Sequence, residues 1–333
     1  MGGQKIEMKI LLSEKIDQVG MELLKKNAEV FVAKDTSKEE LVKSVKGMDA
    51  IIVRSSPLYN EVIEAGDRLK VVGRHGIGLD NIDLNFVFGK GIKVVNTPTA
   101  NSNSVSEHVI AMMMALSKKL LLCDTKMKNK ELCVEGISLT GYGVRLGCGG
   151  LELKGKTLAI AGFGRIGKLI AKKCVAAFDM NVKVYDPPLY KKIELPEKYE
   201  WAESVDELVK DADYISLNLP ILPSTRNIIN KTVFDKMKPT AILVNCSRGG
   251  TVNEEDLYTA LKNHRIYGAG IDVYAHEPPL KDNKLFELDN IILTPHMAAS
   301  TKESQEAMAL EVSQGVIDVL NGKEPYNLVK PRK

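Results

Sequence analysis

The chain has 333 residues, of which 44% are hydrophobic and 27% are charged. This mixture is typical of a folded globular protein, and it excludes a disordered chain, a collagen-like repeat and a small disulfide scaffold. The formal net charge of +3, from 46 basic and 43 acidic side chains, is too balanced to favour nucleic acid as a partner. At about 150 residues per domain, the length predicts two domains.

Cysteine usage and apolar runs bear on the compartment. The five cysteines form no Cys-x-x-Cys pair, and an odd number of this kind fits free thiols in a reducing compartment. The longest apolar stretch, Val109 to Leu116, is too short to span a bilayer, and the N-terminal residues lack the apolar region of a secretory signal. We therefore expect a cytoplasmic protein that does not bind membranes.

In the first third of the chain, short apolar runs alternate with helical patterns. The helical patterns cover residues 14–26, 38–44, 59–65 and a short segment near Asn85. Apolar runs without polar alternation are typical of parallel strands covered by helices on both faces. These runs are MKILL (8–12), AEVFV (28–32), AIIV (50–53), KVVG (70–73) and IKVV (92–95).

The rest of the chain predicts a second sheet of the same kind. A long helix is expected over residues 104–122 with Asn101 or Ser102 as its cap, and the glycine-rich stretch 136–150 is expected to be a loop or arm. A helix over 301–320 closes the chain. The expected strands are KTLAIAG (156–162), NVKVYD (181–186), DYISLNL (213–219), TAILVNC (240–246), IYGAGIDV (266–273) and NIILT (290–294). The predicted fold class is α/β, with two doubly wound parallel sheets.

A glycine-rich motif carries the strongest functional signal. Gly162, Gly164 and Gly167 form G-x-G-x-x-G between a predicted strand and a predicted helix, which is the context that a dinucleotide site requires. The first glycine allows a tight turn, the second allows a pyrophosphate to approach the backbone, and the third allows close packing of strand and helix. The helix N-terminus then offers N–H groups and a positive dipole to the anion.

An acidic residue follows the next predicted strand. Asp186 stands 19 residues after Gly167, where a carboxylate can accept hydrogen bonds from the adenosine ribose and repel a 2′-phosphate. The cofactor predicted is therefore NAD rather than NADP. The alternative is a tight turn in a purely structural domain, with Asp186 as a solvated strand end.

Three later strands are each followed by a residue suited to chemistry on a 2-hydroxy or 2-oxo acid. Arg248 can hold a carboxylate or polarise a carbonyl, His296 can exchange a proton, and Glu277 can orient the imidazole and favour its cationic form. Because ligands bind beyond the carboxyl ends of parallel strands, the three side chains are expected to converge. The alternatives are a surface salt bridge, a turn-forming acid and a loop histidine. The other histidines, without comparable context, are His75, His108, His264 and His276.

Several long segments, in order, resemble the NAD-dependent D-2-hydroxyacid dehydrogenases. They are VRSSPL, VVGRHGIGLDNID, VNTPTANSNSVSEH, AGFGRIG, VYDPP, VNCSRGG, AGIDVYAHEPP and TPHMAAST. The resemblance implies a flavodoxin-like substrate domain, a Rossmann NAD-binding domain, and Arg248, Glu277 and His296 as the catalytic residues. It implies substrate-binding positions at Arg54, Ser55, Arg74, Gly76, Ile77, Gly78 and Asn101, with backbone N–H groups of residues 76–78 facing the substrate carboxylate. The implied cofactor-binding positions are Gly162, Gly164, Arg165, Ile166, Gly167, Asp186, Leu219, Cys246, Ser247, Asp272 and Ala298. No metal site is implied.

Within this family, VGRHGIGLDNID and PHMAASTKESQ are most similar to the D-3-phosphoglycerate dehydrogenases of serine biosynthesis. Arg54 and Arg74 match positions at which those enzymes place basic side chains near the substrate phosphate, and arginine can bind two phosphate oxygens at once. Alternatively, the two arginines pair with Asp80 or Asp83. The family pattern is broken by the glycine- and cysteine-rich segment 133–150, by Leu219 and by Ala298, and no appended regulatory domain of the serine-binding type is expected.

The resemblance also implies the domain boundaries and assembly. The substrate domain is expected at residues 1–103 and 299–333, with the NAD domain at 104–298 inserted between them. The stretch 118–153 resembles the family's dimerisation arm, so a homodimer is expected. The function implied is hydride transfer between NAD(H) and D-3-phosphoglycerate or 3-phosphohydroxypyruvate. The alternatives are a hydroxypyruvate or glyoxylate reductase, another D-2-hydroxyacid dehydrogenase, or an NAD-sensing scaffold similar to the C-terminal-binding-protein corepressors.

Overall fold

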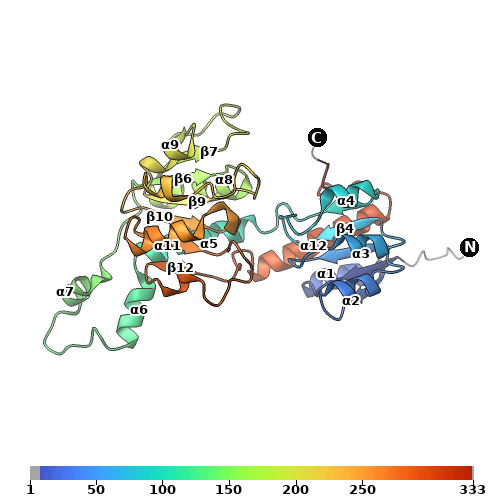
Figure 1. Ribbon diagram of the computed structural model, residues 1–333, viewed down its shortest axis with the longest axis horizontal. Coiled ribbons are helices and arrows are strands. Elements are labelled where there is room, and N and C mark those ends of the chain that lie inside the picture. The colour runs from blue at the N-terminus through green and yellow to red at the C-terminus, as the bar shows by residue number, and fades with distance from the viewer. Residues whose placement is uncertain (1–7, 332–333) are drawn as a thin grey trace, which may run out of the picture. The chain divides into compact units, whose positions relative to one another are not determined.

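The computed structural model describes residues 8–331 (Figure 1). The chain forms two compact units that are described separately below. The first unit contains the residues up to Asn101 together with those from Ala299 onward, and the second contains Ser102–Ala298. The chain therefore leaves the first unit between Asn101 and Ser102 and returns to it between Ala298 and Ala299.

Within its described residues, the first unit has a five-stranded parallel sheet in the order β2-β1-β3-β4-β5. This is the flavodoxin-like strand order, as the sequence predicts. The strands are β1 (Lys9–Leu12), β2 (Glu29–Val32), β3 (Ala50–Val53), β4 (Val71–Arg74) and β5 (Lys93–Val95). The helices are α1 (Gln18–Lys25), α2 (Lys38–Ser44), α3 (Asn60–Ala65), α4 (Leu84–Gly89) and α12 (Lys302–Leu320).

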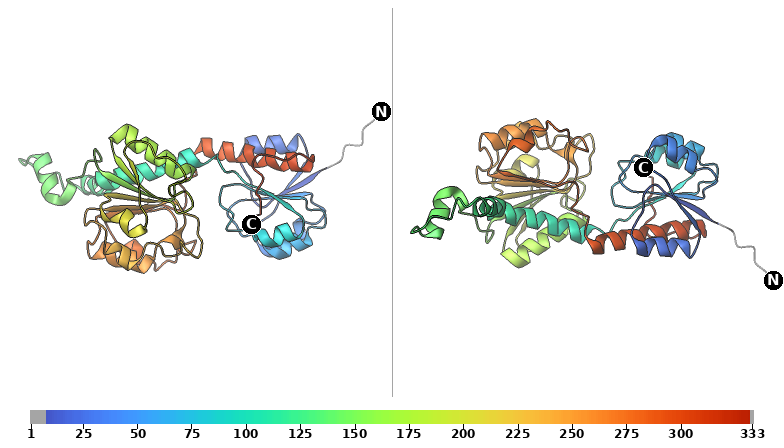
Figure 2. Two further views of the ribbon diagram at one scale, coloured as in Figure 1. Left: turned by 90° about the horizontal axis from the view of Figure 1, so that it is seen from above. Right: turned by 90° about the horizontal axis from the view of Figure 1, so that it is seen from below.

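Both faces of this sheet are buried, which explains its apolar strands. Ile51 and Val53 of β3 pack with α2, α3 and α4, whereas Ile52 packs with α1 and α12 on the opposite face. Figure 2 shows α1 and α12 side by side. Gly20 permits this approach, since a Cβ atom there would lie 2.7 Å from the Cβ of Ala309.

The second unit has, among its described residues, a seven-stranded parallel sheet in the order β12-β11-β10-β9-β6-β7-β8. Its first six strands have the Rossmann order, and β12 extends the sheet. The strands are β6 (Thr157–Ala161), β7 (Asn181–Tyr185), β8 (Tyr199–Trp201), β9 (Tyr214–Leu217), β10 (Ile242–Asn245), β11 (Gly268–Ile271) and β12 (Ile291–Leu293). The predicted fold class is thus confirmed for both sheets.

Helices again cover both faces, with α5 and α8 on one side and α9, α10 and α11 on the other. The helices are α5 (Ser102–Ser117), α6 (Leu120–Lys128), α7 (Leu139–Gly143), α8 (Arg165–Phe178), α9 (Val205–Lys210), α10 (Lys231–Phe234) and α11 (Glu254–Lys262). Short turns complete the unit: a π-helical turn, η1 (Val144–Cys148), and two 3₁₀ turns, η2 (Gly249–Thr251) and η3 (Lys284–Glu287). Among the residues that the structure describes, no helix is both long enough and apolar enough to cross a membrane.

The segment between α5 and β6 differs from its prediction. The single helix expected over residues 104–122 is divided into α5 and α6 at Lys119, whose φ of +50° lies in the left-handed region. The expected loop contains α7 and η1. We call residues 118–153 the arm, because α6 and α7 stand apart from the helices that cover the sheet (Figures 1 and 2). Several of its apolar side chains are exposed: Leu120, Leu121, Met127, Val134, Ile137, Leu139 and Val144.

Candidate active site

The glycine motif forms the turn from β6 into α8, and its geometry fits a dinucleotide. Gly162 has φ of +91°, and a Cβ atom there would lie 2.4 Å from the carbonyl oxygen of Asn218. A Cβ on Gly167 would lie 2.2 Å from the carbonyl oxygen of Gly162. At Gly164 no atom lies within 4 Å of the Cβ position, and α8 begins there without a side-chain cap. The residues thus leave space and N–H groups for a pyrophosphate.

Asp186 follows β7 beside this turn. Its Oδ2 accepts a hydrogen bond from the N–H of Phe163 at 2.8 Å, and its Oδ1 accepts one from the N–H of Leu189 at 3.2 Å. A carboxylate has about four acceptor positions, so both oxygens can accept further hydrogen bonds. Asp186 therefore fixes the glycine turn and still presents acceptors next to it.

The loop after β10 places Arg248, and the buried Asn245 shapes that loop. Its Oδ1 accepts hydrogen bonds from the N–H and hydroxyl of Ser247, and its Nδ2 donates to the carbonyl oxygen of Arg248. Gly249 lies against the backbone of Tyr274, because a Cβ there would stand 1.9 Å from the Tyr274 carbonyl group. The loops after β10 and β11 are therefore in direct contact.

Glu277 and His296 come together at the ends of β11 and β12. The Nδ1 atom of His296 lies 2.8 Å from Oε2 of Glu277, and Oε1 of Glu277 accepts from the N–H of Tyr274 at 3.0 Å. Burial alone would raise the pKa of Glu277, but these hydrogen bonds, followed by the charges of His296 and Arg248, lower it below its ordinary value. The side chain of His296 is 50% exposed, so its ring can be reached from outside. The structure brings together Arg248, Glu277 and His296.

The backbone around His296 is fixed by the buried Asp272, which follows β11. Its Oδ1 accepts from the N–H of Met297 at 2.8 Å and from the hydroxyl of Thr294 at 2.6 Å, and its Oδ2 accepts from the N–H of Ala298 at 3.0 Å. The N–H of His296 donates to the Asp272 carbonyl oxygen. His296 has φ of +53°, a conformation that costs about 1–3 kcal/mol outside glycine, and this network holds it there.

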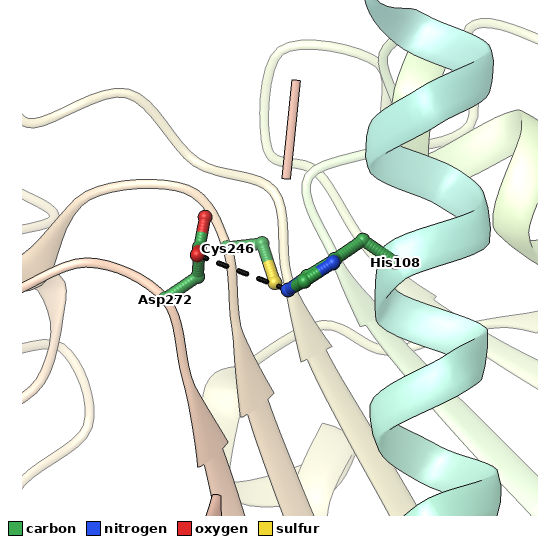
Figure 3. A group of neighbouring side chains, drawn as sticks. All are labelled: His108, Cys246 and Asp272. Carbon is green, nitrogen blue, oxygen red and sulfur yellow. Dashed lines mark ion pairs between the residues drawn. The ribbon is translucent and has the colours of Figure 1, made fainter. Parts of the chain in front are cut away.

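Figure 3 shows His108 of α5, Cys246 after β10 and Asp272 after β11 as neighbours whose donor atoms lie within 4.8 Å of one another. The Nε2 atom of His108 is 3.8 Å from Oδ1 of Asp272 and 3.2 Å from the hydroxyl of Thr294. Metal ions bind the cysteine thiolate, but burial and then the Asp272 charge raise the pKa of Cys246 well above its usual range. With Asp272 already binding two N–H groups, we interpret the group as a polar wall of the candidate site.

The remaining positions implied for the cofactor lie around the same strand ends. Leu219 is buried beside Gly162, and the carbonyl oxygen of Ala298 accepts from the hydroxyl of Ser104 at 2.6 Å. Arg165 and Ile166 open α8, and Ser247 lies in the loop after β10.

In the first unit, Arg54 and Arg74 lie at the carboxyl ends of β3 and β4. Arg54 donates to the carbonyl oxygen of Lys15 at 3.1 Å and to Oε1 of Gln305 at 3.3 Å. Asp83, considered above as an alternative partner, caps α4 by accepting from the N–H of Phe86. Arg74 donates to the carbonyl oxygen of His75 and covers Gly76.

His75 lies buried between these two arginines. Burial, followed by the charges of Arg54 and Arg74, lowers the pKa of His75 to about 4. The imidazole is therefore neutral at neutral pH, and Nε2 has no hydrogen-bond partner among residues 8–331. The positive charges of Arg54 and Arg74 therefore both act on the His75 ring.

The next residues are the positions expected to face the substrate carboxylate. The N–H of Gly76 donates to the carbonyl oxygen of Arg74 at 2.9 Å. The N–H groups of Ile77 and Gly78 have no partner within the described chain. Ser55 is exposed, and Asn101 is buried.

Several residues that support the site were not predicted. Asn245 and Tyr274 make hydrogen bonds within their own loops, to Thr251 and to Glu277. Thr294 and Gln305 act over a longer sequence distance, on Asp272 and on Arg54. A polar residue at the end of an apolar strand, such as Asn245, is the sequence signal that could have indicated such a role.

Comparisons with known proteins agree with this architecture. Residues 110–298 match the family model for "D-isomer specific 2-hydroxyacid dehydrogenase, NAD binding domain". The chain is 40% identical over 97% of its length to a D-3-phosphoglycerate dehydrogenase of Methanocaldococcus jannaschii, of which it spans 59%. It is 37% identical over 94% of its length to a hydroxypyruvate reductase of Thermotoga maritima, of which it spans 98%.

A solved structure shows the same fold over nearly the whole chain. The TT0316 protein of Thermus thermophilus has a TM-score of 0.86 and 30% identity, and the match covers 97% of this chain and 100% of that one. These findings confirm the resemblance seen in the sequence motifs and identify NAD as the cofactor of the matched domain. The chain belongs to the D-isomer specific 2-hydroxyacid dehydrogenase family of NAD-dependent oxidoreductases.

Proposed function

We propose that this protein transfers hydride between NAD(H) and a D-2-hydroxy acid or its 2-oxo counterpart. The observation that carries this proposal is the hydrogen bond between Glu277 and His296, with Arg248 acting on the same carboxylate. All three side chains follow strands of the sheet that also carries the glycine turn.

NAD(H), when bound, supplies or accepts the hydride. Glu277 holds Nδ1 of His296, so Nε2 is the ring nitrogen that exchanges the proton of the hydroxyl or carbonyl oxygen. The Glu277 carboxylate, which stays ionised because its pKa is lowered, stabilises the imidazolium. Arg248 binds the substrate carboxylate or polarises the carbonyl group.

The substrate that we propose is D-3-phosphoglycerate or 3-phosphohydroxypyruvate, which places the protein in serine biosynthesis. Arg54 binds two neutral oxygens and has no carboxylate partner among the described residues. Its charge and that of Arg74 both act on His75. A phosphate dianion would neutralise this charge, and arginine suits it through paired hydrogen bonds.

A hydroxypyruvate or glyoxylate reductase is the second candidate. It is supported by the similarity to the hydroxypyruvate reductase of Thermotoga maritima over 98% of that protein. The third candidate is not an enzyme but an NAD-sensing scaffold. Tight NADH binding without turnover of any 2-oxo acid would identify it.

We also propose a homodimer formed through the arm, because exposed apolar side chains gather on it. A cavity of about 320 Å³ lies next to α6, the first helix of the arm, and is lined by Leu116, Leu121 and Tyr267. A cytoplasmic location is proposed as well, and the five free cysteines support a reducing compartment.

The test is the consumption of NADH with a panel of 2-oxo acids: phosphohydroxypyruvate, hydroxypyruvate, glyoxylate and pyruvate. A kcat/KM highest for phosphohydroxypyruvate is expected. A preference for an unphosphorylated acid would replace the phosphoglycerate assignment with that of the reductase. Size-exclusion chromatography with light scattering tests the dimer.

A further inference from the structure

Two cysteines meet at the base of the arm. Cys123 lies in α6. Cys148 is the last residue of the η1 turn, in the segment that returns to the sheet. The Sγ atom of Cys123 lies 3.8 Å from the carbonyl oxygen of Cys148, and the neighbouring Cys148 thiol contributes to a raised pKa of Cys123. A second contact across the base of the arm is the hydrogen bond from Nζ of Lys119 to the carbonyl oxygen of Gly147, at 2.9 Å.

Next to the sheet, the outgoing and returning chains are also joined by a hydrogen bond from the N–H of Leu151 to the carbonyl oxygen of Ser117, at 2.8 Å. No residue of α6 is buried, and Gly147 has φ of +85°, which indicates a turn rather than regular structure. The two cysteines are 25 positions apart in sequence, so a covalent bond between them would close the whole outer part of the arm into a loop. Such a bond would restrict the arm more than any non-covalent contact now does.

We propose that Cys123 and Cys148 form a reversible disulfide that closes the base of the arm when the protein meets a small-molecule disulfide. The thiolate of one cysteine attacks the S–S bond of the oxidant and forms a mixed disulfide, releasing one thiol. The second cysteine attacks the protein sulfur, the Cys123–Cys148 bond forms, and the second thiol leaves. Two protein thiols are oxidised, one disulfide is reduced, and the two protons end on the released thiols.

Three properties of the chain support this pairing over others. Both cysteines are partly exposed, so an oxidant can reach them. Cys148 is among the groups that raise the pKa of Cys123, after burial, and the attack by the Cys123 thiolate is therefore faster at higher pH. By contrast, burial raises the pKa of Cys174 to about 12, and burial followed by the Asp272 charge raises the pKa of Cys246 well above its usual range. Cys133 is exposed but lies farther along the arm.

The experiment uses the full chain incubated with oxidised glutathione, then alkylated under denaturing conditions and digested with trypsin. Cleavage after lysine and arginine separates the three arm cysteines into peptides 120–126, 131–145 and 146–154. The expected product is a disulfide that joins 120–126 to 146–154 and disappears on reduction. Of the five cysteines, two should then escape alkylation.

Matched variants separate this bond from general oxidation. Cys123→Ser and Cys148→Ser should each abolish the cross-linked peptide, whereas Cys133→Ser should retain it. NADH binding by each variant checks that the protein is folded. In a second measurement, trypsin is used briefly on the native protein, where the exposed Lys128 and Lys130 lie between the two cysteines. Fragments cut there should remain joined without reductant in the oxidised protein and separate in both serine variants.

The proposal is overturned if the folded protein gives only glutathione adducts on Cys123 or Cys148, a disulfide that includes Cys133, or five alkylated thiols after oxidation. None of these measurements depends on enzyme turnover. The disulfide proposal can therefore be wrong while the dehydrogenase proposal is right, and the dehydrogenase proposal can be wrong while the disulfide forms.

Discussion

Gly249 and Tyr274 are in backbone contact so close that no side chain fits between them: a Cβ atom on Gly249 would lie 1.9 Å from the carbonyl group of Tyr274. Arg248 precedes this glycine, and the N–H of Tyr274 donates to Glu277. The contact therefore sets the spacing between the loop that carries the cation and the loop that carries the acid.

This contact predicts that Gly249→Ala lowers kcat/KM by about 10²-fold, because the two loops must separate by an ångström or more. Gly250→Ala is the matched control. A Cβ there would meet the ends of two flexible side chains, Ile221 at 3.1 Å and Arg226 at 3.7 Å, so near-normal activity is expected. Steady-state kinetics of both variants, with circular dichroism as the folding check, decide the matter. Equal losses in the two variants would show that the contact has no special role.

His296→Ala should lower kcat by about 10²–10⁴-fold, since it removes the proposed acid–base group. NADH affinity, measured by energy transfer from the single tryptophan, should be nearly unchanged. Glu277→Gln keeps the shape of the partner without its charge, and its rate should lie between those of wild type and His296→Ala. A His296→Ala enzyme with almost full turnover would remove this residue from the reaction.

Asp186→Ala should weaken the preference for NAD over NADP, because it removes the repulsion of a 2′-phosphate. It should also lower stability somewhat, since Asp186 accepts from the N–H of Phe163 in the glycine turn. Asp186→Asn, which retains an acceptor but not the charge, separates the two effects. A wild-type enzyme that uses both cofactors equally would contradict this role for Asp186.

Arg54→Ala should raise the KM for phosphohydroxypyruvate about tenfold or more, which corresponds to losing about 1.4 kcal/mol of binding. The KM for hydroxypyruvate should hardly change, since it has no phosphate. We choose Arg54 over Arg74 because Arg74 covers Gly76, and its loss would disturb the neighbouring loop. Arg68→Ala, which removes a partner of Asp49 at the other end of β3, is the control. Parallel losses with both substrates would argue against a phosphate contact.

The pKa of His75, about 4, predicts that its NMR signal stays constant between about pH 8 and pH 5. Inorganic phosphate or phosphohydroxypyruvate should raise this pKa, because either would offset the charges of Arg54 and Arg74. His75→Asn assigns the signal among the five histidines. A pKa that does not respond to phosphate would place the anion elsewhere.

The same group makes stability depend on pH. Its folded pKa lies below the ordinary value of 6.5, so the unfolded chain binds the proton more tightly. The contribution, about 3 kcal/mol, is complete above pH 6.5 and is lost as pH falls toward 4. Urea unfolding followed by circular dichroism at several pH values should show this loss in wild type and not in His75→Asn.

Local patterns were sufficient to predict the two sheets, because strands covered on both faces must be continuously apolar. The short edge strand β8 was missed: its three residues include Glu200, and aromatic packing of Tyr199 and Trp201 against Phe163 holds it in place. The break at Lys119 was missed as well, since lysine gives no signal of left-handed backbone. Both features depend on tertiary contacts.

The proposed catalytic side chains were recognisable from residue type and position after strands, and the structure brings them together. Most of their supports were not recognisable, because hydrogen bonds such as those that Asp272 accepts from the N–H groups of Met297 and Ala298 join segments about 25 positions apart. Asp272 was expected among cofactor-binding positions, and that role stays a prediction. The buried carboxylate of Asp272 also fixes the backbone next to His296, because it accepts hydrogen bonds from the N–H groups of Met297 and Ala298.

Asp272 binds the N–H of Ala298, the last residue of the second unit, just before the chain enters the first at Ala299. The residues of the proposed redox chemistry, from the glycine turn to His296, thus lie in one continuous stretch of the amino-acid sequence, whereas Arg54, Arg74 and His75 lie outside it. Under the proposed roles of Arg54 and Arg74, substitutions in the flanking segments would change substrate preference without altering the residues proposed for hydride and proton transfer. A library that randomises positions 54, 74 and 75 is accordingly a rational starting point for redirecting the enzyme to a different 2-oxo acid.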